Sequence, residues 1–180
     1  KDKWREEKRP FTFTGLNEDP YLEFTIKSYK DHQGVTNEIG LLKTGDELIV
    51  RDVWGAIHYQ GEGYFIAGGA GITPFIAILR RLRKDKVKDT NHLFFSNRTE
   101  ADIILKEEWD TMPFLKSKFI ISDKPSEKYP ARRIDESFLK ENVKDFSKSF
   151  YVCGPDPMIA EINNILVKLG AKPQAVVFEK

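Results

Sequence analysis

The sequence has 180 residues, 40% of them hydrophobic, which suffices for one large domain or two small ones with an ordinary core. Its 29 basic and 28 acidic residues leave a net charge of +1, which argues against nucleic-acid binding by bulk electrostatics. The single cysteine, Cys153, excludes an internal disulfide framework and any metal or iron–sulfur site of four thiolates. With no apolar run as long as a membrane span and no signal-peptide pattern, we expect a cytoplasmic protein. We expect no metal site either, because the three histidines lack ligand spacing.

The first half of the sequence predicts strands and turns. Apolar and polar residues alternate over Phe11–Thr14, most clearly over Tyr21–Tyr29, and again in the run Glu47–Val53. A short helix is expected from Thr36, whose side chain can cap it. We therefore expect residues 1–62 to form an incomplete antiparallel β-barrel, because three or four strands are too few to close one.

The second half, residues 63–180, alternates between strand and helix patterns. Apolar runs predict strands at 64–67, 92–96, 118–121, 150–153 and 175–178, with helices at 74–84, 103–112, 135–143 and 157–169 between them. This alternation predicts an α/β domain with a five-stranded parallel sheet and helices on both faces. The joint between the halves is expected at Gln60–Gly63.

A glycine-rich turn, Gly68-Gly69-Ala70-Gly71-Ile72-Thr73-Pro74, follows the first strand of this second half. Glycines let the backbone approach an anion closely, and the start of a helix offers unpaired N–H groups. Pro74 suits the first helical turn. The Gly-x-Gly-x-x-Pro spacing departs from the usual dinucleotide fingerprint, so this turn alone leaves open a strand-to-helix connection without a ligand.

A second turn of this kind follows the strand at Phe150, with the sequence Cys153-Gly154-Pro155-Asp156-Pro157-Met158. Open α/β sheets bind ligands beyond the carboxyl ends of their strands. A lone cysteine is more often a small core residue, and the Gly154-Pro155 pair is what favours a ligand here.

These motifs together resemble the ferredoxin–NADP reductase family, with the bacterial flavodoxin/ferredoxin–NAD(P)H reductases as the closest type. The two glycine turns resemble its NAD(P)-binding half. Two earlier motifs resemble its flavin-binding half, namely Arg9-Pro10-Phe11-Thr12 and Gly34-Val35-Thr36-Asn37. The four motifs follow the family's order and cover the chain from Arg9 onward.

The resemblance implies a bound FAD. Arg9 would pair with its pyrophosphate through a planar fork of donors, and Gly34–Thr36 would hold the same group at a helix start. Phe11 would stack on the isoalloxazine ring, and Thr12 would hydrogen-bond to flavin N5. The alternative for Phe11 and Thr12 is an ordinary strand, with the phenylalanine in the core and the threonine facing water.

The resemblance also implies a nicotinamide cofactor. The residues it assigns to that cofactor are Gly69, Gly71, Thr73, Pro74, Cys153, Gly154, Pro155 and Met158, and it makes Thr12, Cys153 and Glu179 the catalytic residues. Ser96 and Arg98 follow the second strand, where a 2′-phosphate would be read, and this favours NADP, with NAD as the alternative. A solvated loop is the other interpretation of that segment.

Two departures from the family concern the ends of the sequence. Only eight residues precede Arg9, so we expect a longer protein that supplies roughly 30–40 further residues of barrel, at about 5–6 per strand plus turns; the alternative is an incomplete barrel that binds flavin poorly. The closing Glu-x-aromatic pattern lacks its final aromatic after Glu179.

We expect a flavin-dependent NAD(P)H oxidoreductase that passes electrons to a small acidic carrier such as a ferredoxin or flavodoxin. The alternatives are a free-flavin reductase, a non-catalytic nucleotide-binding or redox-sensing module, and the reductase module of a larger protein. The basic run Arg80–Lys88 is interpreted first as a solvated helix end and second as a surface for an acidic carrier.

Overall fold

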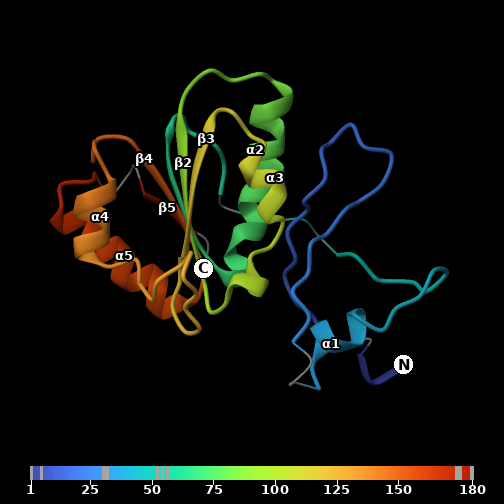
Figure 1. The fold of residues 1–180 in the computed structure, drawn as a ribbon. Coiled ribbons are helices and arrows are strands. Elements are labelled where there is room, and N and C mark those ends of the chain that lie inside the picture. Colours follow the sequence, from blue (N-terminus) through green and yellow to red (C-terminus); the bar gives the residue numbers. More distant parts are fainter. Residues whose placement is uncertain are drawn as a thin grey trace.

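The computed structural model describes residues 2–4, 6–29, 33–51, 53, 55 and 57–172, and the backbone of 176–178. The segment before Gly63 is mostly irregular and lies beside a layered α/β part that begins there (Figure 1). None of the helices among these residues has the length and apolar character that a membrane span requires.

The α/β part is built on one parallel sheet with the strand order β3-β2-β1-β4-β5. Its strands are β1 (Gly63–Gly68), β2 (Asn91–Asn97), β3 (Leu115–Ile121), β4 (Ser149–Cys153) and β5 (Val176–Phe178). The direction of travel across the sheet reverses between β1 and β4, whose ends meet with Ala67 opposite Cys153. Ligands in open α/β sheets bind at such a reversal, beyond the carboxyl ends of the strands.

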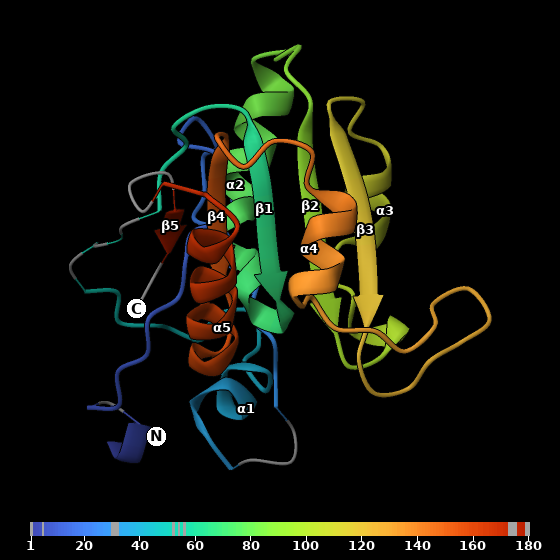
Figure 2. The same ribbon diagram turned by 90° about the vertical axis from the view of Figure 1, so that its left-hand side faces the viewer.

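Helices cover both faces of the sheet (Figure 2). On one face lie α2 (Thr73–Lys84) and α3 (Lys106–Asp110), and on the other α4 (Glu136–Asn142) and α5 (Asp156–Lys168). Phe65 and Ile66, neighbours on β1, are both fully buried and belong to the two different cores, one on each face. A strand buried on both faces must be apolar throughout, and this explains why the second half could be interpreted as strands. The predicted α/β class with a parallel sheet is confirmed.

The helix predicted for 103–112 is shorter in the structure. The short helix η3 (Glu100–Asp102) comes first, and a capping box between Thr99 and Asp102 caps its N-terminus. The chain then runs extended at Ile103 and left-handed at Leu105, with φ 53°, so α3 starts only at Lys106.

The predicted barrel is not formed by the described residues of the first part. Their β-pairing is one antiparallel bridge between Phe13 and Phe24, and the strands predicted over Tyr21–Tyr29 and Glu47–Val53 do not form there. A strand needs a neighbour for its backbone N–H and C=O groups. Ile49 is 63% exposed, so its alternating pattern has no partner layer among these residues.

Two short helices complete the first part, η1 (Asp2–Trp4) and α1 (Val35–Ile39). The prediction that Thr36 caps the second of these was wrong. Gly34 occupies the N-cap position, where its carbonyl accepts the N–H of Asn37 at 3.1 Å, and Thr36 lies inside the helix.

Candidate functional site

A cavity of about 350 Å³ lies between the irregular first part and the carboxyl ends of β1 and β4. From the first part it is lined by Pro10, Phe11, Thr12, Thr25, Ile26, Lys27, Tyr29 and Thr36, and from the α/β part by Ala70, Gly71, Thr73, Pro74, Cys153, Gly154 and Asp156. Residues from three of the predicted motifs and Thr36 of the fourth therefore border one space.

The first glycine turn runs through the short helix η2 (Gly69–Ile72) into α2. Gly69 has φ +53°, a left-handed conformation that glycine adopts without strain. A Cβ atom at Gly71 would lie 2.4 Å from the Cys153 carbonyl oxygen and 2.6 Å from the Gly154 nitrogen. The two glycine turns are therefore in backbone contact, and only a residue without a side chain permits it.

Helix α5 packs against the second glycine turn. A Cβ atom at Gly154 would lie 3.2 Å from the Gly68 backbone and 3.2 Å from the Met158 sulfur. At Gly68 the Met158 sulfur would be only 2.4 Å away. Met158, predicted as a cofactor-binding residue, is not among the side chains that line the cavity and instead supports both turns. Pro155 is the N-cap of α5 and accepts the Met158 N–H at 2.9 Å.

Phe11 and Thr12 reach the cavity because two segments of the first part run side by side. The Thr14 N–H donates to the Glu23 carbonyl at 2.8 Å, and the rings of Phe13 and Phe24 lie 4.7 Å apart. These contacts place the segment that carries Thr12 next to the segment that follows Phe24.

The cavity residues Thr25, Ile26, Lys27, Tyr29, Ala70 and Asp156 were not predicted from the sequence. The period-2 spacing of Thr25, Lys27 and Tyr29 puts these three side chains on one face of an extended segment. Lys27 also makes an ion pair of 2.9 Å with Asp102, and this contact together with Thr99 lowers the pKa of the Asp102 carboxyl.

Several predicted site residues are not brought to the cavity wall. Arg9 is exposed, and its guanidinium donates to the Glu7 carboxylate at 3.1 Å and to the Lys8 carbonyl at 2.6 Å.

Ser96 lies at the end of β2, opposite Gly68. Arg98 is 79% exposed and donates to Asp123 at 2.9 Å. Gly34 and Val35, like Gly69, are absent from the lining, and Glu179 lies outside the described residues.

Asn97, next to Arg98, is a further polar residue at the end of β2. Its side chain is only 4% exposed, yet neither amide atom has a hydrogen-bond partner among the described residues. Buried polar groups are nearly always bonded, so the Asn97 amide is an exception to this rule near the carboxyl end of β2.

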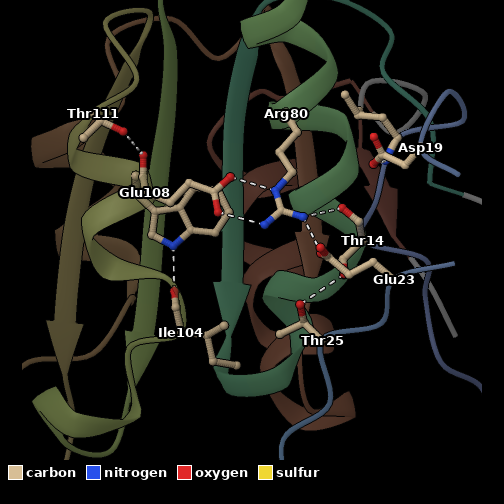
Figure 3. Close-up of polar contacts among 10 residues, drawn as sticks. Thr14, Asp19, Glu23, Thr25, Arg80, Ile104, Glu108 and Thr111 are labelled. Atoms are coloured by element: carbon tan, nitrogen blue, oxygen red, sulfur yellow. Dashed lines mark hydrogen bonds and ion pairs between the residues drawn. The ribbon is translucent and has the colours of Figure 1, made fainter. Parts of the chain in front are cut away.

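A polar network around Arg80 joins the first part to α2 and α3 (Figure 3). Arg80 of α2 donates to both carboxylate oxygens of Glu108, at 2.7 and 2.9 Å, and to the Thr14 carbonyl at 2.8 Å. It also pairs with Glu23, and this contact, with a hydrogen bond from Thr14, lowers the pKa of the Glu23 carboxyl. The interpretation of the basic run as a solvated helix end was therefore wrong for Arg80.

Comparisons with known proteins agree with this architecture. Residues 65–164 match the family model of the oxidoreductase NAD-binding domain. NADH-cytochrome b5 reductase 1 of Eremothecium gossypii is 33% identical, over 92% of this chain and 64% of that protein. Nitrate reductase [NADH] 1 of Nicotiana tabacum is 33% identical, over 90% of this chain and 22% of that protein.

A solved structure supports the fold. A ferredoxin NADP+ reductase from Neisseria gonorrhoeae, determined with bound FAD and NADP, superimposes with a TM-score of 0.80 at 18% identity. The match covers 95% of this chain and 78% of that one. The chain thus belongs to the oxidoreductase NAD-binding domain family, and its fold is that of the ferredoxin NADP+ reductase described above.

Proposed function

We propose that this protein is a flavin-dependent NAD(P)H oxidoreductase in which the cavity between the two parts brings a nicotinamide and a flavin together. The observation that carries the proposal is the shared lining, in which Phe11 and Thr12 border the same space as Gly71 and Cys153. An aromatic ring, a hydroxyl donor and two turns without side chains fit a flat heterocycle and a phosphate-bearing cofactor. A bound flavin supplies the hydride-accepting atom.

The residues of this chain divide the work of binding and orientation. The Thr12 hydroxyl would donate to flavin N5, and Phe11 would pack against the flavin ring. Gly71 and Gly154 keep space for the nicotinamide, while Thr73 and Cys153 orient it; Glu179 is proposed as the acidic residue of this pocket. Arg9 and Gly34–Thr36 are proposed to hold the flavin pyrophosphate, for which Arg9 exchanges Glu7 for phosphate oxygens.

We propose NADH as the preferred donor rather than NADPH. The sequence favoured NADP because Arg98 was available for a 2′-phosphate, but its guanidinium donates to Asp123. A carboxylate at that position repels a phosphate and accepts hydrogen bonds from ribose hydroxyls. The two curated relatives described above are also named for NADH.

We propose a protein as the electron acceptor, and the names of the relatives make a b5-type cytochrome the first candidate, ahead of a ferredoxin or flavodoxin. The chain spans about a fifth of the tobacco nitrate reductase and 64% of the fungal reductase, so further parts of those proteins have no counterpart in it. Oxidation of the reduced protein by cytochrome b5 but not by ferredoxin would support this order of candidates, and the reverse would overturn it.

Two observations favour a second function, a nucleotide-binding module without flavin. Arg9 does not line the cavity, and the first part lacks the predicted strands among its described residues. The two functions differ in flavin reduction, which a module without flavin does not show, and in the flavoenzyme Thr12→Val tests the donor to flavin N5. The flavoenzyme loses about 10²-fold in flavin reduction rate with nearly unchanged NADH binding, because a donor to the reacting atom is removed. An unchanged rate in stopped-flow absorbance would refute the role of Thr12.

A further inference from the structure

We propose that Arg80 is a positioning residue that fixes the distance between the flavin side and the nicotinamide side of the cavity. This inference rests on the proposed function. Arg80 does not line the cavity. It joins α2, which starts at the nicotinamide side, to the two segments that supply Thr12 and Thr25 (Figure 3).

The α/β side of this connection is rigid. Phe75, Ile76 and Leu79 of α2 are fully buried, so the helix is locked against the sheet. Glu108, which receives the guanidinium fork, precedes Trp109 on α3. Trp109 is also fully buried, and its indole N–H donates to the Ile104 carbonyl at 2.7 Å. A bidentate arginine–carboxylate pair fixes orientation as well as distance, so Arg80 is held before it meets the first part.

The remaining nitrogen of Arg80 holds the first part. It donates to the Thr14 carbonyl at 2.8 Å and pairs with Glu23. Thr14 is fully buried, and its hydroxyl donates to Glu23 at 2.8 Å and accepts from the Thr25 hydroxyl at 3.1 Å. The chain of bonds therefore runs from Arg80 to Thr25, which lines the cavity, and it holds Thr14, two residues beyond Thr12.

The helix between the two ends behaves as a rigid spacer. Arg80 follows Thr73 by seven residues, which corresponds to about 10 Å along a helix axis at 1.5 Å per residue. Because α2 moves as one body, any displacement of the first part from Arg80 also displaces it from Thr73 and Pro74 at the start of the helix. Hydride transfer depends steeply on such distances, and a misplacement of about 1 Å costs about 10²-fold in rate.

The next residue of the same helix provides a matched control. Arg81 also reaches the first part, where it pairs with Glu18, but its side chain is 37% exposed against 22% for Arg80. It touches no backbone carbonyl of the first part among the hydrogen bonds of the described residues. Exposed ion pairs of this kind contribute little, because water and salt screen them.

The test compares Arg80→Lys and Glu23→Gln with Arg81→Lys. Lysine keeps the charge but cannot form the fork to Glu108 and hold Thr14 at the same time. Glu23→Gln leaves Arg80 and Glu108 intact, so it serves if the arginine variant folds poorly. Three quantities are measured: the rate constant of flavin reduction in stopped-flow absorbance, the dissociation constant for NADH, and amide hydrogen exchange of segments 11–14 and 23–25 without flavin.

We expect Arg80→Lys to slow flavin reduction about ten- to hundredfold, and Glu23→Gln less, while the NADH dissociation constant changes by less than about threefold. Exchange should accelerate in segments 11–14 and 23–25 and stay unchanged in β1 and β4. Arg81→Lys should leave all three quantities within about twofold.

The inference is overturned if Arg80→Lys and Glu23→Gln reduce flavin within about twofold of the wild-type rate, or if Arg81→Lys slows it equally. Equal acceleration of exchange in β1 and β4 would also overturn it, because Arg80 would then only stabilise the fold. Failure of the proposed function has a different signature. The wild-type protein itself would show no flavin reduction by NADH, and no positioning role would remain.

Discussion

Replacement of Gly71 by alanine tests whether contact between the two glycine turns builds the cavity. The added Cβ atom would lie 2.4 Å from the Cys153 carbonyl oxygen and 2.5 Å from its carbon. Ordinary contact begins at 3.4 Å, so the turns must separate by about 1 Å. Backbone atoms surround the site on the Cys153 side, and no flexible side chain can move away in their place.

The size of the effect follows from that overlap. Overpacking of a tight site costs about 1–3 kcal/mol, which we expect as the loss in free energy of unfolding for Gly71→Ala. A separation of about 1 Å at the edge of the nicotinamide pocket should also slow flavin reduction by up to about 10²-fold.

Gly63→Ala is the matched control. Its Cβ atom would lie 2.0 Å from the Ser149 carbonyl oxygen, also between β1 and β4 but at the opposite end of these strands. Urea denaturation should show a loss of about 1–3 kcal/mol for both variants, while only Gly71→Ala weakens NADH binding and slows reduction. The reasoning is refuted if Gly71→Ala binds NADH and is reduced as fast as the wild-type protein, or if both variants lose function equally.

Three further predictions concern the Arg98–Asp123 pair, the burial of His92 and the core residue Leu79. Asp123→Asn releases Arg98 from its carboxylate partner, so the ratio of NADPH to NADH affinity in equilibrium titrations should rise about tenfold; an unchanged ratio would show that Arg98 does not read the ribose. Burial lowers the pKa of His92, and the charges of Lys116 and Lys148 add to this shift while Glu62 opposes it. The stability that neutral His92 contributes is therefore present above its unfolded pKa of about 6.5 and is lost as the pH falls through its folded pKa. His92→Phe should therefore flatten the fall in unfolding free energy as pH decreases below the unfolded pKa, as measured by denaturation, and an equally steep fall would exclude His92 as its source. Leu79→Ala should cost about 2–5 kcal/mol of unfolding free energy, against less than about 1 kcal/mol for the half-exposed Val167→Ala, and equal losses would contradict the assigned core.

The α/β part was predictable because local pattern and tertiary context agree there. Strands buried on both faces are continuously apolar, and amphipathic helices separate them, so periodicity alone identified elements such as β1 and α2. The glycine motifs were found for the same reason, since Gly69 and Gly71 occupy positions that a larger residue would strain or obstruct.

The first part was predicted less well because a strand pattern describes one surface of a segment and not its partner. Tyr21–Tyr29 alternates as a strand should, but bridges only at Phe24 among its described residues. The contacts of Arg80 could not be predicted for the same reason, because its partners Thr14, Glu23 and Glu108 are distant in sequence. No local pattern distinguishes it from its exposed neighbour Arg81. The domain boundary at 62/63 and the role of Glu179 stay predictions.

In the proposed function one cavity holds a flavin and a nicotinamide in reactive contact. The decisive measurement is the visible absorption spectrum of the protein incubated with FAD and freed of unbound cofactor, recorded before and after NADH is added without oxygen. We expect flavin bands that remain with the protein and bleach on addition of NADH. Absence of flavin bands, or bands that NADH leaves unchanged, would contradict the proposed function.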